Sequence, residues 1–71
     1  MTKHRDRGDE ICDYIERYSK LHGYPPTVRE VTRASGLAST GATFHWLQKL
    51  VVDGRIRMTP RTSRSLVVLH E

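Results

Sequence analysis

A helix stop and a helix start lie only three residues apart near the middle of this 71-residue chain, and this spacing constrains the fold more than any other feature. Thr27 and Glu30 form a capping box, which predicts a helix over residues 28–35. Gly36 can end that helix in the left-handed conformation, and Ser39 can cap the next one. Two helices joined by so tight a turn form a helix-turn-helix, although the same pattern also fits a scaffold hairpin of two helices.

The helix that follows the turn, residues 39–53, is expected to end at Gly54 and to have two different faces. Its inward face is predicted from side chains that recur at helical spacing, namely Thr43, Leu47 and Leu50. The opposite face presents Gly41, His45, Gln48 and Val52. Because this outer face carries hydrogen-bonding groups and no carboxylate, it suits a polyanion. We interpret the segment as the recognition helix of a DNA-binding domain.

The chain before the capping box predicts another helix, from Asp9 to about Leu21. Ile11, Ile15 and Tyr18 form its apolar stripe at a period near 3.6, with Tyr14 and Leu21 beside them. The glycine and two prolines of residues 23–26 end this helix and impose an extended link. Residues 1–8 are polar, and we expect them to be frayed.

After the third helix the apolar residues alternate, which indicates strands rather than helix. Ile56 and Met58 would face inward from the first strand, and Leu66 and Val68 from a second strand over residues 66–69. Residues 59–63 form the turn between them. The predicted fold class is therefore α+β, mainly α: three helices and a two-stranded antiparallel β-hairpin. This is a winged helix-turn-helix that spans residues 1–71 as one domain, with the wing at residues 55–69.

The charge distribution favours a polyanionic partner. The formal net charge is +4, but residues 1–30 hold six acids and six Lys or Arg, whereas residues 31–70 hold six Lys or Arg and one acid. Such an asymmetry bears on partners rather than on fold. The sequence has no apolar run near the ~20 residues that span a bilayer and no secretory signal. We expect a cytoplasmic, prokaryotic or phage protein that is associated with the nucleoid.

Catalysis and metal binding are poorly supported. The histidines at positions 4, 22, 45 and 70 are scattered, and the single Cys12 has no partner at ligand spacing. No nucleophile is paired with a base, and the glycines form no phosphate-binding loop. We expect neither an enzyme nor a cofactor site.

Two runs carry a resemblance to a known family: residues 23–31, GYPPTVREV, and residues 36–40, GLAST. With Leu47, Leu50, Gly54, Ile56 and Arg64, they resemble the N-terminal DNA-binding domain of LexA repressors over residues 9–69. The resemblance implies a winged helix-turn-helix transcriptional repressor of the SOS response that binds a palindromic operator as two protomers. It also implies that the third helix enters the major groove and that the wing holds phosphates. The third helix is closer to Gram-positive members, where a histidine commonly occupies the position of His45.

The sequence also departs from the family. The C-terminal Ser/Lys peptidase half, which also mainly dimerises the family, and its Ala-Gly cleavage site have no counterpart here, so we expect no self-cleavage. A monomer that pairs only on DNA is the expected state. Gly41 and Phe44 stand where members usually carry other base-reading residues, so the family operator is not assumed.

The candidate DNA-binding residues come from the two helices of the helix-turn-helix and from the wing. They are Thr27, Arg29, Ser39, Thr40, Gly41, Phe44, His45, Gln48, Lys49, Arg57, Arg61 and Arg64. Ser39 is a cap in any case, and Phe44 suits either a thymine methyl or packing on a neighbouring helix. His45 and Gln48 suit bases or phosphates, since glutamine can pair with adenine. The arginines, Arg33 and Arg55 included, suit phosphates as a group, although any one alone could be a solvated charge.

A second hypothesis from another class remains open. Val51 and Val52 predict a small exposed apolar patch, so the chain could instead be a winged-helix protein-interaction module, such as a phage or mobile-element modulator of a host factor. RNA binding is a weaker alternative, because the interleaved surface aromatics of single-strand binders are absent.

Overall fold

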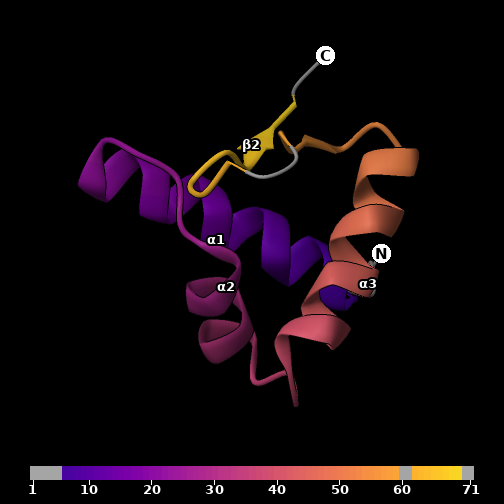
Figure 1. The fold of residues 1–71 in the computed structure, drawn as a ribbon. Helices are drawn as coiled ribbons and strands as arrows, with labels where there is room; N and C mark the ends of the chain where they lie inside the picture. Colours follow the sequence, from indigo (N-terminus) through magenta and orange to yellow (C-terminus); the bar gives the residue numbers. More distant parts are fainter. Residues whose placement is uncertain (1–5, 60–61, 70–71) are drawn as a thin grey trace, which may run out of the picture.

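The structure is a computed structural model that describes residues 6–59 and 62–69. In chain order its elements are α1 (Arg7–His22), α2 (Val28–Ser35), α3 (Thr40–Val52), β1 (Ile56–Arg57) and β2 (Val67–Val68). Three helices and a two-stranded antiparallel sheet confirm the predicted winged helix-turn-helix (Figure 1). The turn between α2 and α3 lies at the bottom of that view, and α3 rises from it on the right.

Helix α1 begins earlier than predicted, and the expectation that the chain is frayed up to residue 8 is wrong for residues 6–8. Asp6 is the N-cap, because its carboxylate accepts from the Asp9 N–H at 2.9 Å. Asp9 in turn accepts from the Asp6 N–H at 3.2 Å, which completes a capping box. Gly8 is buried, so this first turn also packs on the core.

Helix α2 and the turn after it follow the predicted boundaries. The Thr27 N–H donates to Glu30 at 2.8 Å and the Glu30 N–H donates to Thr27 at 3.1 Å, as the capping box required. Gly36 ends the helix at φ 68°, a left-handed conformation that favours glycine. Ser39 then caps α3 by accepting from the Ala42 N–H at 3.2 Å. The helix-turn-helix is therefore built from the cap signals that predicted it.

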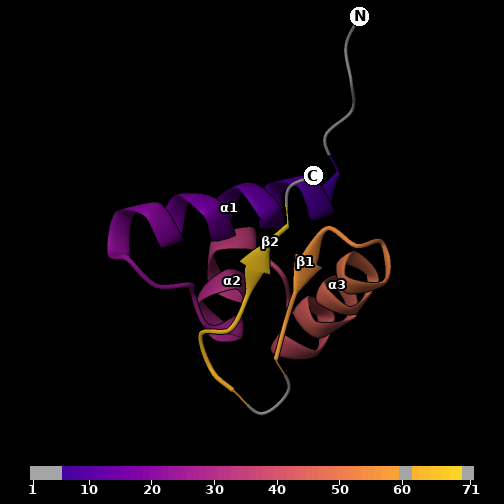
Figure 2. The ribbon, with the colours of Figure 1, turned by 90° about the horizontal axis from the view of Figure 1, so that it is seen from above.

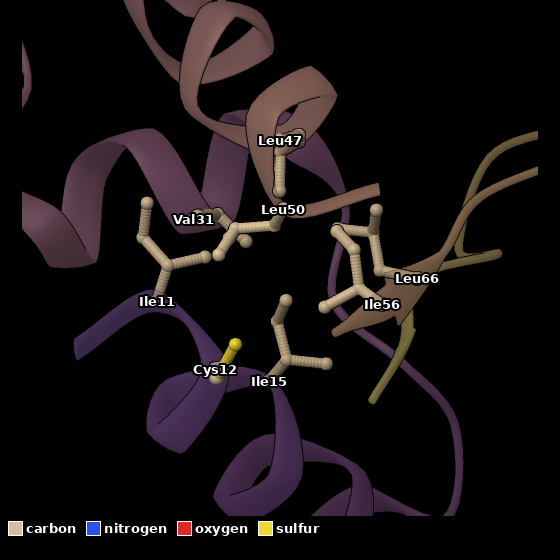
Figure 3. Packing of buried hydrophobic residues seen from close by; sticks show 8 residues of the cluster. All are labelled: Ile11, Cys12, Ile15, Val31, Leu47, Leu50, Ile56 and Leu66. Atoms are coloured by element: carbon tan, nitrogen blue, oxygen red, sulfur yellow. The ribbon is translucent and has the colours of Figure 1, made fainter. Parts of the chain in front are cut away.

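The core lies where all elements meet, and Figure 3 shows its side chains converging from the three helices and the hairpin. Its buried apolar members are Ile11, Cys12, Ile15, Val31, Leu47, Leu50, Ile56 and Leu66. The inward face of α3 is confirmed, since Thr43 and Leu47 are fully buried and Leu50 is 2% exposed. Leu21 does not extend the α1 stripe inward as predicted. It is 78% exposed, because it lies in the last turn, beyond the part of α1 that the core covers.

A hydrogen bond between hydroxyl groups joins the two helices of the helix-turn-helix. The Thr43 and Thr32 Oγ1 atoms are 2.5 Å apart, and Thr32 also donates to the Val28 carbonyl at 2.8 Å. Either hydroxyl can donate the shared bond, because Thr43 Oγ1 also lies 3.3 Å from the Ser39 carbonyl oxygen, to which it can donate. The buried Thr43 hydroxyl is therefore satisfied between α2 and α3.

The hairpin is shorter than predicted but has the expected orientation. Ile56 pairs with Val68 and Arg57 with Val67, with β1 packed on α3 and β2 on α1 (Figure 2). The paired residues end at Arg57 and Val67. Beyond them the Ser65 hydroxyl links the two arms of the hairpin, since it accepts from the Thr59 N–H at 3.0 Å and donates to the Thr59 carbonyl at 3.1 Å. None of the helices in the described ranges is long and apolar enough to cross a bilayer.

Candidate nucleic-acid interface

An open groove of about 410 Å³ lies between the start of α2, the first half of α3 and the wing. Thr27 and Arg29 line it from α2, and Thr40 and Phe44 line it from α3. Residues 62–66 close it from the wing side. Segments that are far apart in the sequence thus surround one hollow, and five of the predicted site residues line it: Thr27, Arg29, Thr40, Phe44 and Arg64.

The outer surface of α3 borders this groove. Gly41, His45 and Gln48 are exposed, as predicted from the helical period, and α3 contains no Asp or Glu. Gly41 and His45 each come one position after a groove residue, and Gln48 lies one turn beyond Phe44. The three therefore form a strip of α3 beside the groove. Groove and strip together make one continuous surface of small, aromatic and hydrogen-bonding side chains.

Phe44 and Trp46 differ in how far they reach solvent. Phe44 is 45% exposed at the groove, so only part of its ring packs on the protein. Trp46 is half-buried and packs on the core, and Lys49 Nζ lies 5.3 Å from the centre of its ring. A large apolar side chain left half-open at α3 can contact a ligand, whereas Trp46 supports the helix.

Four of the predicted cations are exposed and form no ion pair within residues 6–59 and 62–69: Arg29, Arg33, Lys49 and Arg57. Arg29 lies at the groove itself. These side chains are available to an anionic partner because no carboxylate of the described part neutralises them. Arg61, another predicted contact, lies outside the described residues.

Two other predicted cations are paired within the protein. Arg55 Nη2 lies 2.7 Å from Asp9 Oδ1, an ion pair that joins the end of α3 to the start of α1. Arg64 Nη1 lies 3.2 Å from Glu30 Oε1. The Thr27 N–H and then Arg64 and Tyr18 lower the pKa of Glu30, which burial opposes. No spacing in the sequence indicates either pair, because the partners are separated by 46 and 34 residues.

The apolar patch that motivated the protein-interaction hypothesis is present. Val52 is 81% exposed and Val51 is 37% exposed at the end of α3. The patch lies at the opposite end of α3 from the groove, which contacts the helix at Thr40 and Phe44.

The described residues contain no group of three or more His, Cys, Asp or Glu that could hold a metal ion. Burial raises the pKa of the Cys12 thiol, and Arg55 only partly opposes this effect. A thiol with a raised pKa is a poor nucleophile at neutral pH, so Cys12 is a packing residue.

Comparison with known proteins identifies relatives over almost the whole chain. The family model described as LexA DNA binding domain matches residues 1–65. A LexA repressor of Exiguobacterium sibiricum is 44% identical over 69 residues, which are 97% of this chain and 34% of that protein. A LexA repressor of a Geobacillus species is 41% identical over 97% of this chain and 33% of its own length. A LexA repressor of Staphylococcus epidermidis is 40% identical over 100% of this chain and 34% of its own length. The chain thus spans about a third of the curated relatives it matches.

Proposed function

The chain belongs to the LexA DNA-binding domain family, and on that premise we propose that it binds double-stranded DNA sequence-specifically, as the DNA-reading part of a LexA-type transcriptional repressor. The observation that carries the proposal is the shared groove, which is lined by α2, α3 and the wing. A DNA duplex that lies across its rim would meet all three elements at once. The role is one of binding, and no catalytic step is assigned to the chain.

In this proposal the first half of α3 lies in the major groove. His45 and Gln48 offer hydrogen bonds to base edges, and Gly41 allows close approach of the backbone. Phe44 offers an apolar surface to a thymine methyl group. Ser39 and Thr40 lie beside the free N–H groups of the α3 start, which suit a phosphate.

The cations are proposed to set the affinity through the DNA backbone. Arg29, Arg33, Lys49 and Arg57 are the predicted contacts that are exposed and form no ion pair in the described part of the chain. If all four neutralise phosphates, the logarithm of the affinity falls with the logarithm of salt concentration at a slope of about −3.6, or about 0.9 per phosphate. Contacts from outside the described residues would make the slope steeper.

The proposal extends to the assembly and its setting. Two protomers are proposed to bind the halves of a palindromic operator, within the SOS response, in a prokaryotic cytoplasm. A two-fold axis between the protomers would then match the symmetry of the operator.

Selection from random duplex DNA, followed by titration of the enriched duplex and of a random one at several salt concentrations, tests this function. An enriched motif bound more tightly than random DNA is expected. His45→Ala is expected to weaken the enriched duplex more than the random one, whereas the matched control Arg57→Ala weakens both about equally. If selection enriches no motif, sequence-specific binding is wrong.

The protein-interaction module is the second candidate, and only the valine patch favours it. The comparisons do not support it, since the family and the relatives named above are repressors and their DNA-binding domain. This candidate would be favoured if selection enriches no motif and the domain binds all duplexes alike, with an affinity that changes only with salt concentration.

A further inference from the structure

Arg64 was expected to hold a phosphate, but its guanidinium contacts α1 and the start of α2, while the side chain stays 37% exposed. We propose that Arg64 is a positioning residue, which locks the wing to the start of α2 and so fixes the width of the groove. The proposal rests on the proposed function, because it concerns how the DNA-binding surface is held in shape.

The guanidinium of Arg64 is surrounded by acceptors from three parts of the chain. Nη1 lies 3.2 Å from Tyr18 Oη on α1, 3.1 Å from the Pro25 carbonyl oxygen and 3.2 Å from Glu30 Oε1 on α2. Nη2 lies 3.4 Å from Glu30 Oε2. Both ends of the planar group therefore meet the same carboxylate, in the two-pronged geometry that arginine makes and lysine cannot.

Aromatic rings cover the guanidinium as well. Its central carbon lies 4.7 Å from the centre of the Tyr24 ring and 5.9 Å from that of Tyr18. A cation this close to aromatic faces gains further attraction. The ion pair and the hydrogen bonds thus engage both terminal nitrogens of the guanidinium within the protein.

Glu30 makes this contact a junction rather than an isolated surface pair. Its Oε1 also accepts from the Thr27 N–H at 2.8 Å, and its Oε2 accepts from the Tyr18 hydroxyl at 3.1 Å. One carboxylate thus closes the α2 capping box, binds α1 and holds the wing. A network of this kind loses more than one bond when a member is removed.

The contact between Arg64 and Glu30 joins two walls of the groove. Thr27, which caps α2, lines the groove together with Arg29, and residues 62–66 line the wall on the wing side. Arg64 itself has φ 57°, so the wing backbone adopts a left-handed turn at the residue that makes the contact. The link between Arg64 and Glu30 therefore fixes the distance between the two walls.

The decisive variants keep or remove the charge. Arg64→Lys keeps the cation and loses the planar fork, Arg64→Ala removes both, and neither changes the requirement for a left-handed backbone. Arg57→Lys and Arg57→Ala are the matched controls, because Arg57 is an exposed strand residue without an ion pair in the described ranges. Each protein is titrated with the duplex enriched by the unmodified domain and with random DNA, at temperatures where all variants are folded.

If Arg64 is a positioning residue, Arg64→Lys and Arg64→Ala weaken binding to the enriched duplex alike, by about three- to thirtyfold. Binding to random DNA changes less, so the ratio between the two duplexes falls. At position 57, lysine is expected to preserve binding, while alanine makes the salt slope shallower by about 0.9. The proposal is overturned if Arg64→Lys binds as well as the unmodified domain and only Arg64→Ala has a shallower salt slope. Arg64 would then be a phosphate contact.

Amide hydrogen exchange without DNA separates this inference from the proposed function. Arg64→Lys is expected to accelerate exchange of two amides relative to those of α3: the Thr27 amide, which donates to Glu30, and the Thr59 amide, which donates to Ser65 Oγ. Unchanged exchange at both amides overturns the positioning role even if DNA binding is normal. If exchange is faster in Arg64→Lys but the unmodified domain selects no DNA motif, the positioning role is supported and the proposed function is refuted.

Discussion

The two faces of α3 should differ sharply in what they contribute to stability, and a pair of alanine substitutions measures the difference. Leu47 is fully buried, and Val52, on the opposite face, is 81% exposed. Leu47→Ala removes three carbon atoms at about 0.8 kcal/mol each, or about 2.4 kcal/mol, and the cavity that remains raises the cost to about 3–4 kcal/mol. Val52→Ala removes atoms that water already surrounds, so we expect a change within about 0.5 kcal/mol.

That loss is large for a domain of this size. At about 0.05–0.15 kcal/mol per residue, 71 residues have a total stability of about 4–11 kcal/mol. Each kcal/mol shifts the melting temperature by about 4–8 °C in domains of this length, so Leu47→Ala should melt at least about 12 °C lower.

Urea and thermal unfolding of both variants and the unmodified domain, followed by circular dichroism and by Trp46 fluorescence, test the prediction. The two signals should give one transition if unfolding is two-state. A loss below about 1 kcal/mol for Leu47→Ala, or an equal loss for Val52→Ala, would show that α3 is not oriented as described.

Two further outcomes follow from the caps. The pKa of Glu30 is lowered in the folded state, so its stabilisation is complete above the unfolded-state pKa and is lost as pH falls through the folded one. Glu30→Gln, which retains the cap acceptor, should therefore flatten the decline of the urea midpoint below about pH 4.3; an unchanged pH dependence would contradict the lowered pKa of Glu30. Gly36→Ala should lower the free energy of unfolding by about 1–2 kcal/mol, because φ is 68° at that position. Gly41→Ala should stabilise the helix by about 0.5–1 kcal/mol, because the new methyl group would meet only Ser39 Oγ, at 3.6 Å. Melting curves of the two variants that shift in the same direction would refute this contrast.

The sequence predicted the elements whose boundaries are set locally. The capping box at Thr27 and Glu30, the turn glycine Gly36 and the N-cap Ser39 all act within a few residues, so α2 and α3 were found with correct ends. The start of α1 was missed although Asp6 and Asp9 form the same kind of box, because the polar residues around them gave no apolar period.

The contacts that shape the candidate site could not be found in this way. Arg64 meets Glu30 and Tyr18 across 34 and 46 residues, and no spacing in the sequence links them. The charge asymmetry indicated an anionic partner, but counting charges assigned Arg55 and Arg64 to that partner when each has a carboxylate of its own. The shared groove also depends on how the wing folds back, which only the tertiary structure shows.

The buried and exposed faces of α3 have separate roles, which bears on how such a domain can acquire new targets. The side chains that hold the helix in place are turned inward, and those that would meet bases share almost no packing with them. Substitutions on the outward strip can therefore accumulate at little cost to folding. Under the proposed function, a lineage could exchange one operator for another by changing Gly41, His45 or Gln48 while the buried residues of α3 stay unchanged.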